Sequence, residues 1–285
     1  MNRIARSVSA EARKVLATKL WWLLAVVLAG YSAMMAALFA FMFGAMSGSL
    51  GEEFGDAMGA PPAAVPAQAA ADMVYASVTT FGYVIPLLFG ALMATGELRH
   101  RTLGLAFTIE PRRGIVLLGK AIVLLGFGLL IGLAGLVGAV GAGAPTLLAL
   151  EGGPMLDTPE TWLLFVRVVI AMSVWALIGF GVGVLVRNQA FTIVLALVFT
   201  QFIEPVLRAG AQFWEWSAQL AKFLPGAATD AFVGASVMNS MSSLDASFPA
   251  GAEPLTVWGG LGVLLAFAVV AVLAGWATRW RGDIV

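Results

Sequence analysis

The residues of this chain that could do chemistry gather in one polar segment, from Gly96 to Lys120. The segment holds five of the sixteen basic residues and the single histidine, His100. Its last seven residues, from Gly114 to Lys120, fit the first seven positions of a nucleotide-binding P-loop. Ala121 then follows where that motif needs the hydroxyl that holds magnesium. We therefore interpret the match as chance, and any nucleotide that drives this chain would bind another polypeptide.

Signatures of other catalytic sites are absent from the sequence. The chain has no cysteine, which excludes disulfides, thiolate metal sites and cysteine nucleophiles. His100 has no second histidine for a metal site, and neither an H-E-x-x-H nor a G-x-S-x-G motif occurs. We predict no catalytic residue, metal site or cofactor on this chain. A membrane enzyme acting on lipids stays an alternative for which the sequence offers no site.

The composition determines the predicted fold class. Of the 285 residues, 60% are hydrophobic and 11% are charged, and the mean hydropathy is +0.94. Continuous apolar runs recur at the length that a hydrocarbon core of about 30 Å requires, roughly 20 helical residues. The sequence predicts a single all-α membrane domain over residues 1–285. Its six transmembrane helices are expected near 21–46, 73–95, 117–142, 162–186, 190–207 and 256–278.

The charges outside these runs are strongly segregated. One set of ends and loops carries thirteen basic and four acidic residues, whereas the other set carries two basic and eleven acidic residues. Loops rich in lysine and arginine stay in the cytoplasm. Both termini are therefore predicted to be cytoplasmic.

Two segments outside the spans are also expected to form helices. Residues 3–19 repeat apolar side chains three and four positions apart among basic ones, which predicts an amphipathic helix in the membrane interface. The alternative is a basic anchor that only sets topology. Residues 208–255 form a long outer loop rich in aromatic side chains, which predicts short re-entrant helices before the last span.

Apart from Lys120 at the start of the third predicted span, two charged residues, Arg167 and Glu204, fall inside predicted spans. Both lie toward the outer ends of consecutive spans, and neither is placed like a mid-membrane ion relay. We expect them to form an ion pair near the outer face. The alternative is that each side chain extends to the lipid headgroups separately.

The second predicted span combines a proline with aromatic side chains. Pro86 predicts a kink, because proline removes a backbone hydrogen bond from the helix. Phe81, Tyr83 and Phe89 are candidates to line a path for an amphiphilic substrate. The alternative is that these rings only pack against lipid or neighbouring helices.

Glycines four residues apart occur in the third and fourth predicted spans. Gly128 and Gly132 form one such pair, and Gly179 and Gly183 form another. Small residues at this spacing let helix backbones approach closely. We predict tight packing within the chain, with a surface that slides during transport as the alternative.

The inner segment resembles the permease subunits of type-2 ABC exporters, the class that includes bacterial multidrug, antibiotic and lipid exporters. The likeness rests on an acidic residue, a basic stretch with Thr-Leu, and a proline with bases before the next span. These residues are Glu97, Arg99, Arg101, Thr102, Leu103, Pro111, Arg112, Arg113 and Lys120. The run from Phe223 to Thr229 and the basic end from Arg279 to Asp283 are similar to the family as well.

The resemblance implies a location, a function and partners. The chain would be a multi-pass permease of the bacterial cytoplasmic membrane that exports an amphiphilic or lipid-like substrate. Two P-loop ATPase subunits would carry ATP and magnesium, and a second permease, identical or different, would complete the pore among membrane lipids; nucleic acid would not be a partner. The residues implied to couple to the ATPase are Glu97, Arg99, Arg101, Thr102, Glu110, Pro111, Arg112, Arg113 and Lys120.

Two alternatives to this function remain. The basic loop from Gly96 to Lys120 could act only in setting topology. The chain could also be a self-contained secondary transporter or channel, which would work without an ATPase.

Overall fold

Six helical segments are long and apolar enough to cross a membrane. The computed structural model describes residues 3–47, 66–99, 112–150, 153–186, 188–211, 215–235 and 253–280. Within them, spans 1 to 6 are Leu20–Met42, Ala67–Gly96, Arg113–Ala149, Pro159–Val186, Gln189–Gly210 and Val257–Thr278. The chain is therefore a helical multi-pass membrane protein, as predicted.

Some spans are single helices and others are built from several pieces. Spans 1, 3 and 4 correspond to α2 (Leu20–Ser47), α7 (Arg113–Ala149) and α8 (Pro159–Val186). Span 2 joins α4 (Ala67–Gly82) to α5 (Val84–Arg99), and span 6 joins α14 (Val257–Gly275) to the π-helix η3 (Trp276–Trp280). Span 5 consists of α9 (Gln189–Val198), the π-helix η1 (Phe199–Ile203) and α10 (Glu204–Gly210). The helices outside the spans are α1 (Arg3–Leu16), α11 (Glu215–Ala221) and α12 (Pro225–Val233).

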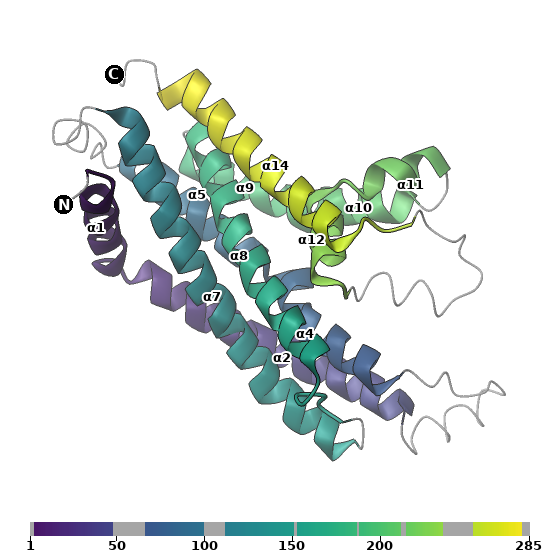
Figure 1. The fold of residues 1–285 in the computed structure, drawn as a ribbon. Coiled ribbons are helices and arrows are strands. Elements are labelled where there is room, and N and C mark those ends of the chain that lie inside the picture. The colour runs from purple at the N-terminus through teal and green to yellow at the C-terminus, as the bar shows by residue number, and fades with distance from the viewer. Residues whose placement is uncertain are drawn as a thin grey trace.

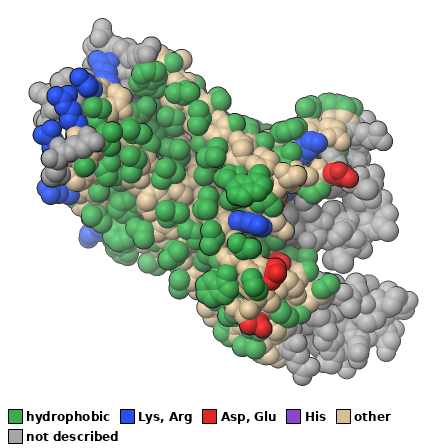
Figure 2. Space-filling model, in the orientation of Figure 1, with side chains coloured by type: hydrophobic (Ala, Val, Ile, Leu, Met, Phe, Trp, Pro, Cys, Tyr) green, Lys and Arg blue, Asp and Glu red, His purple; other side chains and the backbone are tan. Residues whose placement is uncertain are grey.

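Both chain ends lie at the same end of the bundle, as an even number of crossings requires (Figure 1). Helix α1 lies at this end beside the beginning of α7. The space-filling view shows lysine and arginine side chains gathered here, while apolar side chains cover the middle of the visible face (Figure 2). This end is called the basic end below.

Span 2 bends where its proline predicts. Pro86 has no N–H to donate to the carbonyl of Gly82, and the helix breaks at Tyr83, between α4 and α5. The backbone hydrogen bonds resume when the Leu87 N–H donates to the Tyr83 carbonyl at 3.3 Å. The predicted kink is confirmed.

Span 3 extends further from the basic end than the sequence predicted. The predicted span ended near residue 142, which left residues 143–149 to a loop, but α7 continues through them to Ala149. Pro145 removes one backbone hydrogen bond, whereas its alanine, leucine and threonine neighbours keep the helix intact. The Thr146 hydroxyl also donates to the Ala142 carbonyl at 2.8 Å. The loop prediction for these residues was wrong because one proline does not end a long apolar helix.

Glycines bring the backbones of α5 and α8 together. A side chain added at Gly90 would meet the backbone of Ala176 and Phe180, and one added at Gly179 would meet the backbone of Leu87. A Cβ at Gly183 would lie 2.8 Å from the Ala91 carbonyl oxygen. The predicted close packing at the second glycine pair is confirmed.

The first glycine pair packs in the same way between α7 and α8. A Cβ at Gly128 would lie 2.7 Å from the Ser173 Cα, and one at Gly132 would lie 2.9 Å from the Met172 Cβ. The Ser173 hydroxyl donates to the Leu125 carbonyl at 2.8 Å across this contact. Helix α8 is therefore the central element, held closely by α5 and α7.

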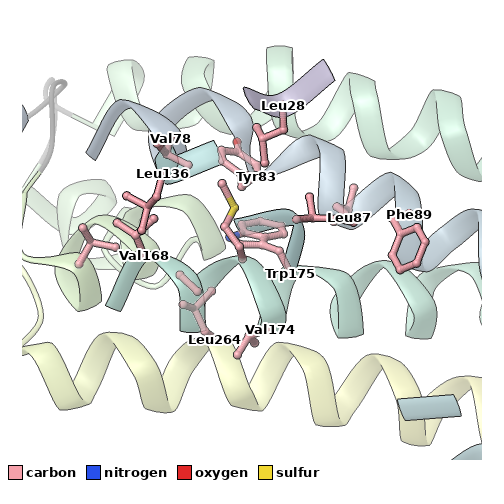
Figure 3. Close-up of a cluster of buried hydrophobic side chains, with 14 of the residues drawn as sticks. Leu28, Val78, Tyr83, Leu87, Phe89, Leu136, Val168, Val174, Trp175 and Leu264 are labelled. Atoms are coloured by element: carbon pink, nitrogen blue, oxygen red, sulfur yellow. The ribbon is translucent and has the colours of Figure 1, made fainter. Parts of the chain in front are cut away.

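The middle of the bundle is filled by large side chains from α8 and span 2 (Figure 3). Trp175 is 1% exposed and stacks on Tyr83, with ring centroids 4.4 Å apart. Phe89 is completely buried and packs against Phe127 of α7. Burying rings of this size contributes much of the packing that holds the helices in place.

Three short helices follow the central part of span 5. Pro205 does not break the chain there, because it occupies the first turn of α10, where its missing N–H needs no partner. Helices α11 and α12 then lie in the region predicted to contain short outer helices. Helix α12 is largely buried and packs against α14, α8 and α4.

Candidate functional site: the α12 clamp and the basic end

The most polar buried region of the described structure lies where span 5 meets α12. Span 5 changes from α9 to the π-helix η1 and returns to α-helix at Glu204. A π-helical turn adds a residue to the turn and is frequently found at functional sites. It helps direct Glu204 inward, where the side chain is only 1% exposed.

Glu204 caps helix α12 from outside that helix. Its Oε1 accepts a hydrogen bond from the Gly226 N–H at 2.5 Å, in the first turn of α12. The first N–H groups of a helix lack intrahelical partners and carry partial positive charge, so a carboxylate there is stabilised. Gly226 permits the approach, because a Cβ at this position would collide with the carboxylate. The second oxygen, Oε2, is buried without a hydrogen-bond partner.

An ion pair repeats this connection one helical turn further along. The Arg208 Nη2 donates to Asp230 Oδ2 at 2.5 Å, and the two side chains are 14% and 3% exposed. Both contacts join residues 22 positions apart, so the amino end of α10 is bridged to the amino end of α12 and the later turn of α10 to the later turn of α12. We call Glu204, Gly226, Arg208 and Asp230 the α12 clamp.

Helix α12 is also attached to the aromatic centre of the bundle. The Trp175 indole N–H donates to the Thr229 hydroxyl at 3.0 Å, and that hydroxyl donates to the Pro225 carbonyl at 2.8 Å. The Tyr83 hydroxyl donates to the Thr200 carbonyl, in the π-helical turn, at 3.0 Å. The clamp is therefore connected through hydrogen bonds to the middle of span 4 and to the break in span 2.

The predicted ion pair between Arg167 and Glu204 does not form in this structure. Arg167 instead lies beside the other end of α12: a Cβ on Gly234 would be 3.2 Å from its Nη1. Gly234 ends the helix with a positive φ of 89°, which glycine adopts without strain. The carboxylate thus lies at the amino end of α12 and the guanidinium at its carboxyl end, which matches the helix dipole at both termini. The two predicted partners are separated by a helix that sequence spacing could not place.

The aromatic residues predicted to line a substrate path mostly fill the core. Tyr83 and Phe89 are 6% and 0% exposed, and their neighbours within this chain enclose them. Phe81 is partly exposed and stacks on Phe39, with ring centroids 5.9 Å apart. In this structure the proposed path is therefore filled at Tyr83 and Phe89, because the kink turns these rings toward α8 and α7.

At the basic end, α1 is joined to α7 by a buried ion pair. Lys120 Nζ lies 2.6 Å from Glu11 Oε2, with side chains 6% and 9% exposed, and Lys14 lies 2.7 Å from the other Glu11 oxygen. The Ser7 hydroxyl donates to the Ile115 carbonyl at 3.3 Å. Val15 is buried in the core that α7 shares. Helix α1 is therefore attached to α7 by a buried ion pair, a hydrogen bond and apolar packing.

The structure describes only part of the predicted coupling set. Lys120, predicted to couple to an ATPase, is buried against Glu11 in this chain, and its coupling role stays a prediction. Arg112 is exposed and Arg113 half-buried at the start of α7, while Glu97 and Arg99 belong to the last turn of α5. Arg101, Thr102, Glu110 and Pro111, which are also predicted to couple, lie outside the described residues.

Sequence reasoning missed most of the α12 clamp. Arg208, Asp230 and Gly226 lie in the long segment that was predicted to be an outer loop with short re-entrant helices, and no site was predicted from them. One available signal was the matching spacing: Glu204 to Arg208 and Gly226 to Asp230 both span four residues. Among the residues that the structure describes, no group of three or more potential ligands could hold a metal ion.

Exchanging the charges between α1 and α7 tests their connection. Glu11→Gln removes the carboxylate charge that lies 2.6 Å from the buried Lys120 ammonium, and breaking a buried ion pair should cost the protein about 3 kcal/mol of stability. The exchange Glu11→Lys with Lys120→Glu should recover much of that loss. Retention of monodisperse protein after heating in detergent measures both effects. Equal stability of Glu11→Gln and the unmodified chain would show that the pair does not hold α1.

Comparison with known proteins gives no relative: the chain matches no family model and no curated protein sequence. The likeness to exporter permeases therefore rests on the residues quoted from the inner segment, the outer motif and the carboxyl end. The outer motif includes Pro225 and Gly226, the first residues of α12.

Proposed function

We propose that this chain is the membrane-spanning permease subunit of an ATP-driven exporter for an amphiphilic or lipid-like substrate. The nucleotide and its magnesium would bind a separate ATPase, two copies of which would dock at the basic end. A second permease would complete the assembly. On this proposal the chain itself forms the translocation path and couples it to the ATPase, and ATP is hydrolysed by the partner.

The main support for the proposal is that the elements that could dock a partner lie together at one end of the bundle. The two chain ends, α1, the end of α5 and the start of α7 all lie there, and lysine and arginine side chains concentrate on that surface (Figures 1 and 2). The positive-inside rule favours the cytoplasm as the location of this end. Residues 100–111, which join α5 to α7, would then face a cytoplasmic partner.

The connection between α1 and α7 supports a route for force. Helix α7 is 37 residues long, and its first two turns contact α1 through Lys120 and Ile115. A push on α1 or on the joining segment would be transmitted along one continuous helix to the outer side. The exposed basic side of α1, with Arg3, Arg6 and Arg13, would rest on anionic headgroups, as an interfacial helix does.

The outer helices fit an exporter as well. Thr229 of α12 contacts Trp175, near the middle of α8, so α12 would be a re-entrant element that descends well below the outer surface. Its polar connections to spans 4 and 5 would let it respond when those spans tilt. Substrate would leave past α12.

Reversing charge at the basic end tests coupling directly. In Arg112→Glu with Arg113→Glu, the chain should still insert and fold, because these side chains lie at the start of α7 outside the core. Stimulation of the partner ATPase by substrate should fall roughly tenfold, within the usual range of coupling between sites. Glu97→Lys is expected to act similarly. Unchanged export in these variants would contradict the docking role.

The decisive experiment is purification of the chain in mild detergent with identification of every bound protein. A P-loop ATPase whose hydrolysis depends on this chain would support the proposal. Transport by the purified chain alone, in ATP-free liposomes, would contradict it.

A second candidate, a self-contained secondary transporter, is favoured by one specific observation. Glu204 is an acidic group buried within span 5, with one oxygen lacking a partner. Ionisable residues in such positions occur in ion and proton pathways. Transport driven by an ion gradient and lost in Glu204→Gln would favour this candidate over the exporter.

A further inference from the structure

Arg167 of α8 carries a positive charge that the described part of the chain does not balance with an acidic side chain. The residue lies inside span 4 and is partly exposed. Among the described residues its guanidinium forms neither an ion pair nor a hydrogen bond, whereas Arg208 is paired with Asp230. The carboxyl end of α12 lies beside the guanidinium, at Gly234. A helix end supplies only about half a negative charge, so Arg167 needs a further anionic partner.

The depth of Arg167 in the membrane follows from the length of α8. Span 4 ends at Val186, toward the basic end, and Arg167 lies 19 residues before that end. At 1.5 Å of rise for each residue, this separation is about 28 Å. The hydrocarbon core is about 30 Å thick, so Arg167 lies close to the headgroups of the opposite leaflet.

The packing of span 6 places Arg167 at the same depth. A Cβ at Gly181 would lie 2.6 Å from the Ala271 carbonyl carbon. A Cβ at Gly275 would lie 2.9 Å from the Val184 Cγ1. Residues of α8 therefore lie beside residues of α14 that follow about 90 positions later in the chain. Extended toward the outer side, this register puts Arg167 level with the first residues of α14.

The side chains at this depth suit a phospholipid. Trp258, the second residue of α14, is 78% exposed, and tryptophan is enriched at the level of the lipid headgroups. On α8 itself, Leu163 and Val166 are 54% and 56% exposed, so the surface around Arg167 is apolar. The protein therefore presents a cation at the headgroup level above an apolar surface. An anionic phospholipid has the complementary arrangement, with a phosphate above its acyl chains.

We propose that Arg167 binds the phosphate of an anionic phospholipid in the leaflet opposite the basic end. A guanidinium donates two parallel hydrogen bonds to a phosphate, which the end of α12 does not offer in exchange. The acyl chains would lie along the lipid-facing side of α8, past Val166. The bound lipid would neutralise the guanidinium while it stays beside Gly234, and so would hold the carboxyl end of α12 in place. This site goes beyond the proposed function and does not depend on an ATPase.

The absence of cysteine from the sequence allows a fluorescent label at a single position beside the site. Val166→Cys is labelled and placed in phosphatidylcholine liposomes that contain brominated phosphatidylglycerol or brominated phosphatidylcholine. Quenching by the two lipids gives their relative binding constant at that position. It should favour phosphatidylglycerol roughly fivefold, as expected for one basic residue near an anionic lipid. Val270→Cys, on the lipid-facing side of α14 and 65% exposed, is the matched control and should show no preference.

Charge variants in the labelled Val166→Cys chain identify the group responsible. Arg167→Gln should abolish the preference, whereas Lys222→Gln, which removes the same charge elsewhere, should leave it unchanged. A preference that survives Arg167→Gln would overturn the inference. So would equal lipid binding at Val166 and Val270, a comparison that keeps the native arginine and decides the question even if Arg167→Gln does not accumulate.

A soluble anion is separated from a lipid by adding inorganic phosphate at millimolar concentration. The preference of the Val166 position for phosphatidylglycerol should persist, because the acyl chains hold the lipid beside α8. Loss of the preference would show a site for free phosphate and would overturn the lipid assignment. The chain is measured without an ATPase, so each of these outcomes leaves the exporter proposal to its own test.

Discussion

Gly179→Ala is expected to destabilise the protein strongly although it adds only one methyl group. The new Cβ would lie against the backbone of Leu87, 2.7 Å from its carbonyl carbon and 2.9 Å from its Cα. A backbone cannot rotate aside as a side chain can, so α5 and α8 would have to separate. Overpacking costs about 1–3 kcal/mol in general, and a backbone clash between two core helices belongs at the upper end.

The lipid-facing Gly126 provides the control for this substitution. A Cβ at Gly126 would meet nothing within 4 Å, so Gly126→Ala should be neutral or raise stability by up to about 1 kcal/mol, because alanine favours helix over glycine. In detergent, Gly179→Ala should lower the apparent melting temperature by roughly 5–10 °C. We therefore expect the melting temperature to fall in Gly179→Ala and to stay the same or rise in Gly126→Ala. Equal melting temperatures for the two variants would contradict the close packing of α5 and α8.

Arg208→Ala should be the most damaging single change in the α12 clamp. It removes the guanidinium that lies 2.5 Å from the buried Asp230 carboxylate, which is 3% exposed. Removing one partner of a buried ion pair costs about 3–5 kcal/mol, because the remaining charge is uncompensated. We expect α12 to detach from α10 before the rest of the bundle unfolds, which increased proteolysis between residues 211 and 235 would report.

Replacing both partners by apolar residues distinguishes the contribution of charge to stability from the contribution of packing. Arg208→Met with Asp230→Leu removes both charges and keeps similar volume, so most of the stability should return. Lys14→Ala is a solvent-exposed comparison: this lysine is 48% exposed, and exposed pairs contribute only about 0–1 kcal/mol. A double variant as unstable as Arg208→Ala alone would show that the loss does not arise from the charge of the carboxylate.

Features set by local chemistry could be predicted from the sequence. Continuous apolar runs predicted the six spans, and Pro86 predicted the break in span 2. The glycine pairs predicted the close contacts of α8 with α5 and α7. Each of these depends on the residue itself or on neighbours within one helical turn. Solvation and backbone geometry decide such features whatever the tertiary arrangement.

Features that depend on packing between distant segments were not predictable in the same way. Lys120 looked like a docking residue, because its sequence neighbours do not reveal that Glu11 approaches it from α1. Arg167 and Glu204 looked like partners, because nothing in their spacing indicates that α12 lies between them. A charged side chain within a span needs a group of opposite charge nearby. That group can be the end of a helix rather than a second charged side chain.

The position of α12 has a consequence for the order of assembly during synthesis. The groups that receive it, Arg167, Trp175 and Glu204, all precede residue 225 and leave the ribosome first. Spans 4 and 5, which bind α12, are therefore synthesised before it, whereas span 6 is synthesised afterwards and packs against α12 at Gly260. Biogenesis can therefore proceed in chain order, and a chain that stops before span 6 would leave α12 uncovered on that side.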